Sequence, residues 1–180
     1  MASRADTINE VSKFLFKCIT KGYDASFAVL QYGNGEDDNL YCQFCITADG
    51  QGRKEFNGIQ AEVIGLGYSG TTKPKVIERF EQLLKWRYER KGELGNAEKI
   101  LGFTNKHKER FKYIAKHGFD GWQQLEEGGN ATQFYNFPRN VEELSEWIEY
   151  SMLILSLVYK LNWDAEWSVI SEADPMNSYI

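Results

Sequence analysis

A glycine-rich string carries the most specific chemistry in the chain. Residues 65–70 match the pattern G-x-G-x-x-G of dinucleotide-binding loops. In that motif the helix begins inside the loop, so that its N-terminal amides meet the pyrophosphate. Here residues 71–74 separate the last glycine from the next helical pattern, and Glu89, at about the spacing of the ribose-binding acid, falls within a helical pattern. We interpret the glycines as a strand exit and expect no cofactor.

The cysteines raise the question of redox or metal chemistry. Cys42 and Cys45 form a C-x-x-C pair, but a redox pair works from a helix N-terminus that lowers the thiol pKa. These two lie in a strand-like run, where positions three apart point to opposite faces. With Cys18 the count is odd, which favours reduced thiols over a disulfide framework. We interpret the cysteines as small packing residues and expect no metal site.

Acid/base chemistry has no clear candidates. His107 and His117 are the two histidines, and neither stands beside a Ser, Cys or acidic residue in a recognisable triad string. The carboxylate pair at 142–143 falls in the first turn of a predicted helix, where negative charge opposes the positive end of the dipole. The sequence therefore predicts that the protein is not an enzyme.

Charge is distributed unevenly along the chain. Residues 73–117 hold 13 Lys/Arg against 6 Asp/Glu, a balance of +7, which leaves −12 for the rest because the whole chain is −5. Basic helices with interleaved aromatic residues can bind phosphates and stack on bases. Interleaved acids and a pI of about 5.2 favour a solvated helix face instead. Nucleic-acid or phosphate binding stays open as the alternative use of this basic patch, which comprises Lys106, Lys108, Arg110, Lys112 and Lys116.

Hydrophobic periodicity predicts the elements that must position these residues. Asp6 is the expected cap of an amphipathic helix that Gly22 ends. Strand-like runs follow at 26–32, 39–47 and 59–66, and their polar, Gly-rich spacers are short enough for hairpins.

The second half of the chain predicts helices at 74–91 and from Thr104 to Gly118, then strands at 121–126 and 131–137. Asn140 caps a last helix whose apolar stripe is Val141, Leu144, Trp147, Ile148, Met152, Leu155 and Tyr159. The acidic tail 162–180 is expected to be irregular. Three consecutive hairpin-connected strands cannot form a parallel array. The predicted fold class is therefore α+β, an antiparallel five-stranded sheet with helices on one face, in the order α-βββ-α(α)-ββ-α.

Length and composition predict one domain, residues 1–180, because a chain of this size with 42% hydrophobic residues can bury a core unaided. The N-terminal residues lack the apolar region of a secretory signal, and no apolar run approaches the length that spans a bilayer. We expect a cytoplasmic location and no contact with a membrane.

Several strings resemble a known grouping in their order and spacing. They are Tyr41-Cys42-Gln43-Phe44, Gly58-Ile59-Gln60-Ala61-Glu62-Val63, Gly118-Phe119-Asp120-Gly121-Trp122, and residues 130–138 from Asn130 to Pro138. Over roughly residues 8–160 the chain resembles the YbjN-like and type III secretion chaperone-like fold, the TY-Chap peptide-binding chaperone family. The resemblance implies a chaperone-like protein with a polypeptide partner and leaves a homodimer open. It also makes residues 72–103 look like a helical insertion.

These observations together predict a non-enzymatic, chaperone-like binding module that holds a polypeptide. A nucleic-acid or phosphate-binding accessory protein and an immunity or phage-encoded inhibitor protein remain alternatives. Strand parity places Cys42 and Phe44 on the core face, with Tyr41 and Gln43 opposite. Gln133 and Tyr135 would join the second set if the register of the fifth strand agrees. The predicted partner-binding residues are Tyr41, Gln43, Gln60, Glu62, Gln133 and Tyr135. The alternatives for this surface are an ordinary solvated sheet face and a face covered by the predicted helix at 74–91.

Overall fold

Two helices and six strands form the part of the chain that the structure describes. This computed structural model describes residues 2–33, 40–48, 57–63, 123–124, 130–159, 161–162 and 165–179. In chain order the elements are α1 (Arg4–Thr20), β1 (Phe27–Tyr32), β2 (Tyr41–Thr47), β3 (Gly58–Val63), β4 (Gln123–Gln124), β5 (Ala131–Tyr135), α6 (Val141–Tyr159) and β6 (Trp167–Glu172).

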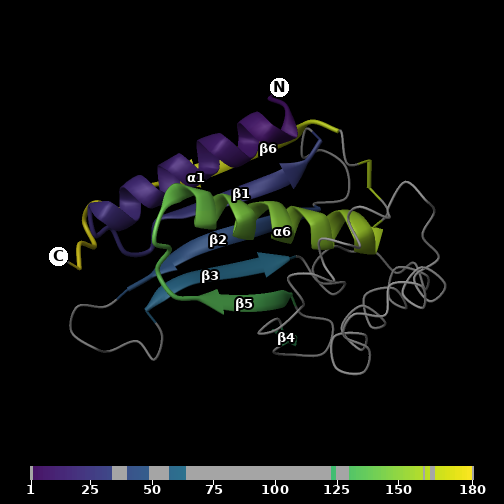
Figure 1. Cartoon of the computed structure of the whole chain (residues 1–180). Helices are drawn as coiled ribbons and strands as arrows, with labels where there is room; N and C mark the ends of the chain where they lie inside the picture. The colour runs from purple at the N-terminus through teal and green to yellow at the C-terminus, as the bar shows by residue number, and fades with distance from the viewer. Residues whose placement is uncertain are drawn as a thin grey trace.

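The strands form one antiparallel sheet in the order β4-β5-β3-β2-β1-β6 (Figure 1). All five strands that the sequence predicts are present, at the predicted places and in an antiparallel arrangement. The α+β fold class is thereby confirmed. The predicted helices at 74–91 and 104–118 and the proposed insertion at 72–103 lie outside the described residues.

The prediction of an irregular tail is wrong for β6. Residues 167–172 pair antiparallel along the whole of β1, from Phe27 opposite Glu172 to Tyr32 opposite Trp167. The tail lacks a clean alternation of apolar and polar residues, since Val169 and Ile170 are adjacent apolar positions. Pairing with the exposed edge of β1, rather than local pattern, therefore makes this segment a strand.

The N-cap of α1 lies three residues before the predicted cap. Ser3 is the N-cap, and its Oγ accepts the backbone N–H of Asp6 at 3.2 Å while donating to the Asp6 carboxylate at 2.6 Å. Asp6 therefore contributes to the cap from inside the first turn. Gly22 ends the helix as predicted: its φ is 70°, and its N–H donates to the carbonyl of Ile19.

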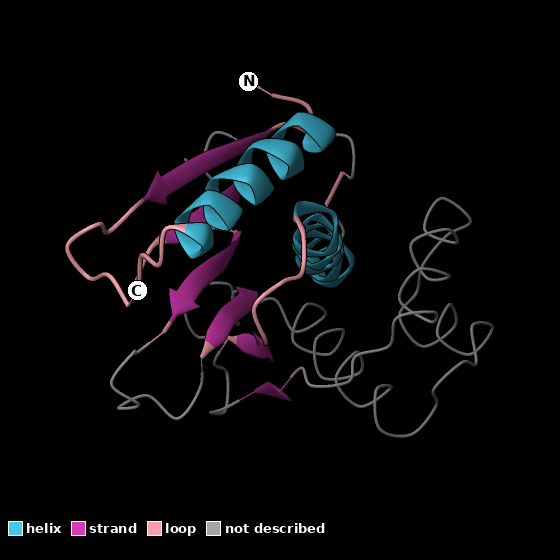
Figure 2. Cartoon of the chain, turned by 60° about the vertical axis from the view of Figure 1, so that its left-hand side comes forward, coloured by secondary structure: helices cyan, strands magenta, loops and turns pink. Residues whose placement is uncertain are grey.

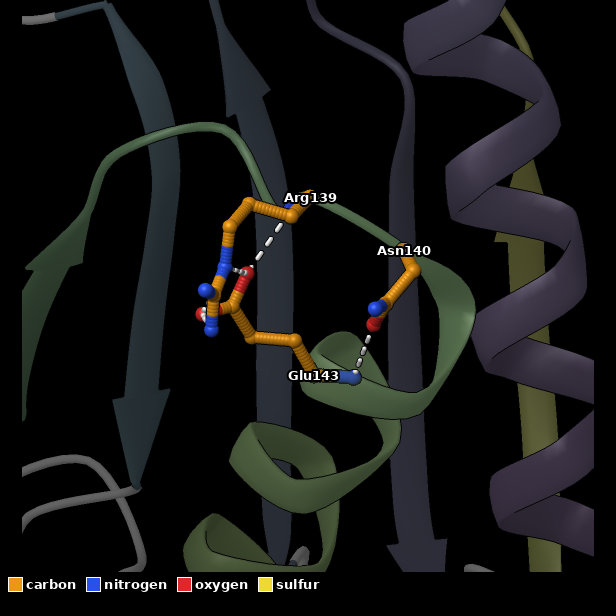
Figure 3. Close-up of polar contacts among 3 residues, drawn as sticks. All are labelled: Arg139, Asn140 and Glu143. Carbon is orange, nitrogen blue, oxygen red and sulfur yellow. Dashed lines mark hydrogen bonds and ion pairs between the residues drawn. The ribbon is translucent and has the colours of Figure 1, made fainter.

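Helix α6 begins at the predicted cap (Figure 3). The Asn140 Oδ1 accepts the N–H of Glu143 at 2.8 Å, and the Glu143 carboxylate accepts the N–H of Arg139 at 2.7 Å and its guanidinium at 3.1 Å. The backbone N–H and then the guanidinium of Arg139 lower the pKa of Glu143. This reciprocal cap fixes where the chain turns from β5 into the helix layer.

Both helices lie on the same side of the sheet, as predicted (Figures 1 and 2). Their apolar stripes cover the strands, and a hydrogen bond of 2.7 Å from Ser145 Oγ to Ser12 Oγ joins the two helices. The core between helices and sheet includes Val11, Leu15, Leu30, Phe44, Ile59, Leu144, Ile148, Met152 and Leu155, all buried.

Tyr179, the last described residue, bonds to the C-terminal end of α1. The N–H of Tyr179 donates to the carbonyl of Gly22 at 2.8 Å, and its hydroxyl donates to the carbonyl of Ile19 at 3.0 Å. The Tyr179 ring stacks on Phe137 with centroids 5.7 Å apart. These contacts anchor the C-terminal segment that follows β6.

Candidate functional site

The two faces of the sheet differ in chemistry as strand parity predicts. On β2 the buried side chains are Cys42, Phe44 and Ile46, and their neighbours Gln43 and Cys45 are only half-buried. On β3 the same alternation holds, with Ile59, Ala61 and Val63 buried and Gln60 and Glu62 half-buried. We call the side under the helices the helix face and the other side the open face.

Cross-strand register arranges the open face in rows. The first row is Ile170, Val29, Gln43, Glu62 and Thr132; the second is Glu172, Phe27, Cys45, Gln60 and Phe134; the third begins Ser168, Gln31 and Tyr41. Each row runs across the strands, so its members are direct neighbours in space. Four of the six predicted partner-binding residues lie on this surface.

The other two predicted residues, Gln133 and Tyr135, are on the wrong face. They pair with Ala61 and Ile59 of β3, which places them on the helix face. Tyr135 stacks on Trp147 of α6, with ring centroids 4.3 Å apart and an interplanar angle of 8°. Register decides this point, because a shift of one residue moves every side chain of a strand to the other face. In the open-face rows their places are taken by Thr132 and Phe134.

A hydrogen-bonded cluster lies at the centre of the open face. Glu62 accepts three amide donors: Gln43 Nε2 at 2.6 Å, Gln60 Nε2 at 2.5 Å and Asn130 Nδ2 at 3.0 Å. Gln43 on β2 lies directly opposite Glu62 on β3. Gln60 lies two residues before Glu62 on β3. The arrangement is set by the sheet, because same-face neighbours on paired strands are within reach of long side chains.

The chemistry of this cluster suits a hydrogen-bond donor. Gln43 and Gln60 each use an amide N–H on Glu62, which leaves their carbonyl oxygens as acceptors. The contacts of Glu62 are amide donors, and within the described ranges no lysine or arginine forms an ion pair with it. The cluster thus combines a carboxylate charge with amide acceptors, which is a suitable environment for a cationic or N–H group.

Apolar side chains surround the cluster. Val29 adjoins Gln43 in the first row, and Phe27 and Phe134 lie at either side of Cys45 and Gln60 in the second. These three apolar side chains are half-buried rather than buried. A polar centre with apolar neighbours can remain in water and still offer contact area to another chain.

Exposure changes along the first row. Ile170 at the β6 edge is 52% exposed, whereas Thr132 on β5 is 2% exposed. Between them Val29, Gln43 and Glu62 are half-buried, so exposure in this row falls from β6 toward β5. Tyr41, at the end of β2, is half-buried and also contacts the core.

The cysteines occupy opposite faces, as their spacing predicts. Cys42 is buried on the helix face, and burial raises the pKa of its thiol well above the usual range. Burial also raises the pKa of Cys18, although a hydrogen bond to Ser26 acts in the other direction. Cys45 lies half-buried on the open face. The C-x-x-C pair is therefore not arranged to form a disulfide.

Other sequence candidates lie outside the described residues: the string 65–70, His107, His117, and the basic patch of Lys106, Lys108, Arg110, Lys112 and Lys116. In the portion that the structure describes, no group of three or more His, Cys, Asp or Glu could hold a metal ion. Nor is any helix of that portion long and apolar enough to cross a membrane.

Besides Thr132 and Phe134, sequence reasoning missed three contributions to this surface. Asn130 lies outside the strands that the sequence predicts, although its amide donates to Glu62. Ile170 and Ser168 belong to β6, which was expected to be irregular. Parity of β1 could have identified Phe27, Val29 and Gln31 once Ala28 and Leu30 were assigned to the core.

Comparison with protein-family models, with curated proteins and with solved structures found no significant match to this chain.

Proposed function

We propose that this protein is a non-enzymatic, chaperone-like module that holds an extended polypeptide against the open face of its sheet. The observation that carries the proposal is the Glu62 cluster, a carboxylate with three amide neighbours bordered by half-buried apolar side chains. Such a surface offers hydrogen bonds to a main chain and flat apolar contact to its side chains.

The charge of the cluster further specifies the partner. Glu62 carries a negative charge with amide rather than cationic neighbours. A lysine or arginine of the partner would provide the cationic group that the described residues do not supply to this carboxylate. The balance of −12 outside residues 73–117 favours the approach of a basic segment. We therefore expect a partner segment with a basic residue between apolar residues.

A display library of random linear peptides tests this function directly. Selection on the intact protein should enrich peptides that combine a basic residue with apolar neighbours. Replacing Glu62 by Gln should weaken the selected peptides by about tenfold or more, because a hydrogen bond to a charged group contributes about 1.5–3 kcal/mol. Fluorescence polarisation with synthetic peptides gives the dissociation constants.

The matched control is Glu10→Gln, which removes the same charge from an exposed position of α1. It should leave affinity unchanged. If Glu62→Gln and Glu10→Gln bind equally well, or if the selected peptides are acidic, the Glu62 cluster is not the binding site.

A further inference from the structure

The outer edge of β6 has backbone groups that can be assigned from the ladder. The N–H of Tyr32 donates to Leu40 and that of Ile46 to Ser26, so the even residues of β1 bond to β2. The N–H of Gly33 donates to Glu166, so the odd residues bond to β6. The two sides of β1 are thus assigned independently and alternate consistently.

The same alternation assigns the two sides of β6. Ser168, Ile170 and Glu172 pair with the odd residues of β1 and direct their backbone groups inward. Val169 and Ser171 therefore direct their N–H and C=O groups outward, away from the sheet. At one end of this edge, Trp167 forms an antiparallel bridge with Ala2.

The part of this edge beyond the Ala2 bridge is exposed. Ile170 is 52% exposed on the open face, and Ser171 and Glu172 are exposed beside it. The strand contains no proline or lysine, the residues that commonly prevent edge-to-edge pairing. After Glu172 the chain turns toward β1, where the N–H of Asp174 donates to Ser26 Oγ at 2.9 Å. The edge available for pairing is therefore short and centred on Ile170.

We propose that β6 pairs antiparallel with β6 of a second copy of this chain, about a two-fold axis that passes at Ile170. Val169 then lies opposite Ser171 of the second copy, and each pair exchanges two backbone hydrogen bonds. Ile170 meets Ile170 of the second copy on the open face. A two-fold contact of this kind is closed, because each copy uses the same edge once.

Self-complementarity selects this register over its neighbours. A pairing of Ser171 with Ser171 would set Ile170 against the carboxylate of Glu172. A pairing of Val169 with Val169 would require the outer groups of Trp167, which already face Ala2. The proposed register instead places the exposed apolar side chain against its own copy and Glu172 opposite Ser168, so no like charges face each other.

The dimer would join two open faces into one surface. Because Ile170, Val29, Gln43 and Glu62 share a row, the row continues across the axis into the second copy. At about 4.8 Å per strand, the two Glu62 clusters would lie roughly 34 Å apart, with Val29 and Ile170 of both copies between them. This last consequence rests on the proposed function; the pairing of β6 does not.

A cross-link across the axis tests the register. Non-hydrogen-bonded antiparallel neighbours have Cα atoms about 4.5 Å apart, within the range of a disulfide. The Ile170→Cys variant should therefore form a disulfide-linked dimer under mild oxidation. The wild type, which has Cys45 on the same face, should not. Non-reducing electrophoresis and mass spectrometry read the result.

Light scattering across a concentration series tests the pairing itself. The wild type should show a dimer, and Ile170→Lys should raise the dissociation constant by at least about tenfold, because like charges would face each other. Met176→Lys, at a 90% exposed position beyond the strand, should leave the dimer intact. Ser171→Pro removes an outward N–H and should weaken the dimer while each copy stays folded by circular dichroism.

Two results would overturn the proposal. One is a wild-type protein that stays monomeric throughout the series; the other is a dimer that Ile170→Cys does not cross-link. If the edge instead binds a synthetic strand peptide and the protein remains monomeric, its occupant is another polypeptide and not a second copy. None of these results depends on the peptide selection that tests the open face.

Discussion

The helix face and the open face belong to the same strands, yet they differ in every property that matters for recognition. On β2 and β3 the helix face contributes Phe44, Ile46 and Ile59, all fully buried under α1 and α6. At the alternate positions of the same two strands, the open face contributes Gln43 and Glu62, which are joined by a hydrogen bond of 2.6 Å. Because side chains alternate along a strand, adjacent residues fall in the packed core and on the candidate recognition surface.

The polar contacts of the two regions differ in what surrounds them. In the helix layer that covers the helix face, Ser145 of α6 donates a hydrogen bond to Ser12 of α1, and this bond joins the two helices. On the open face three side-chain amides donate to the carboxylate of Glu62, and half-buried side chains of the neighbouring strands lie beside it. The first contact is satisfied within the fold, whereas the second retains acceptors and charge for a partner.

Thiol reactivity should give the largest difference between the faces. Cys42 is buried and its thiol pKa is raised by burial, so alkylation requires opening of the core. We expect Cys42 to react with iodoacetamide more than about a thousandfold more slowly than Cys45 at neutral pH, given the usual stability of folded domains. Mass spectrometry of timed samples measures both rates. Equal rates would contradict the assignment of the two cysteines to different faces.

Core truncation should give the next largest effect. Phe44→Ala should lower the free energy of unfolding by about 3–5 kcal/mol, because the phenyl ring is fully buried between the sheet and the helices. Cys45→Ala, at the adjacent position on the open face, should lower it by about 1 kcal/mol or less. Urea titration measures both values. A similar loss in the two variants would mean that the open face is also packed.

The register of β5 predicts an intermediate effect. Tyr135→Ala removes a stacked neighbour of Trp147 on the helix face and should destabilise the protein by about 2 kcal/mol without changing peptide affinity. In a double-mutant cycle with Trp147→Ala, the coupling energy should be about 0.5–1.5 kcal/mol. The control is Phe134→Ala, which removes an aromatic ring from the adjacent position of β5 but from the open face. Loss of peptide affinity in Tyr135→Ala with unchanged stability would reverse the assignment of faces.

Acid titration should show the smallest effect, at the cap of α6. The pKa of Glu143 is lowered in the folded state, first by the backbone N–H and then by the guanidinium of Arg139. Its contribution is therefore present above the unfolded pKa of about 4.3 and is lost as the pH falls through the lower folded value.

The matched pair of variants is Glu143→Gln and Glu142→Gln, which remove the same charge from adjacent positions. At about pH 6, Glu143→Gln should be less stable than wild type by about 0.5 kcal/mol, and the difference should shrink toward about pH 3. Glu142→Gln should show little difference at either pH. A constant difference across this range in thermal unfolding would show that the Arg139–Glu143 contact is not what stabilises the cap.

The sequence by itself determined the features that depend on near neighbours along the chain. Alternation in residues 41–47 determined which side chains of β2 face the core, because side chains alternate along any extended strand. Asn140 and Gly22 marked the start of one helix and the end of the other, because caps satisfy local backbone groups. The α+β class followed from the order of these local signals.

Only the tertiary structure decided the features that depend on distant partners. Residues 167–172 form a strand because they pair with the edge of β1, and the local sequence pattern does not predict this strand. The register of β5 against β3 places Tyr135 on the helix face, since pairing with Ile59, 76 residues earlier in the chain, fixes parity. Asn130 and Glu62 meet for the same reason. Periodicity identifies the two faces of a single strand, but only pairing between strands determines which residues share a face.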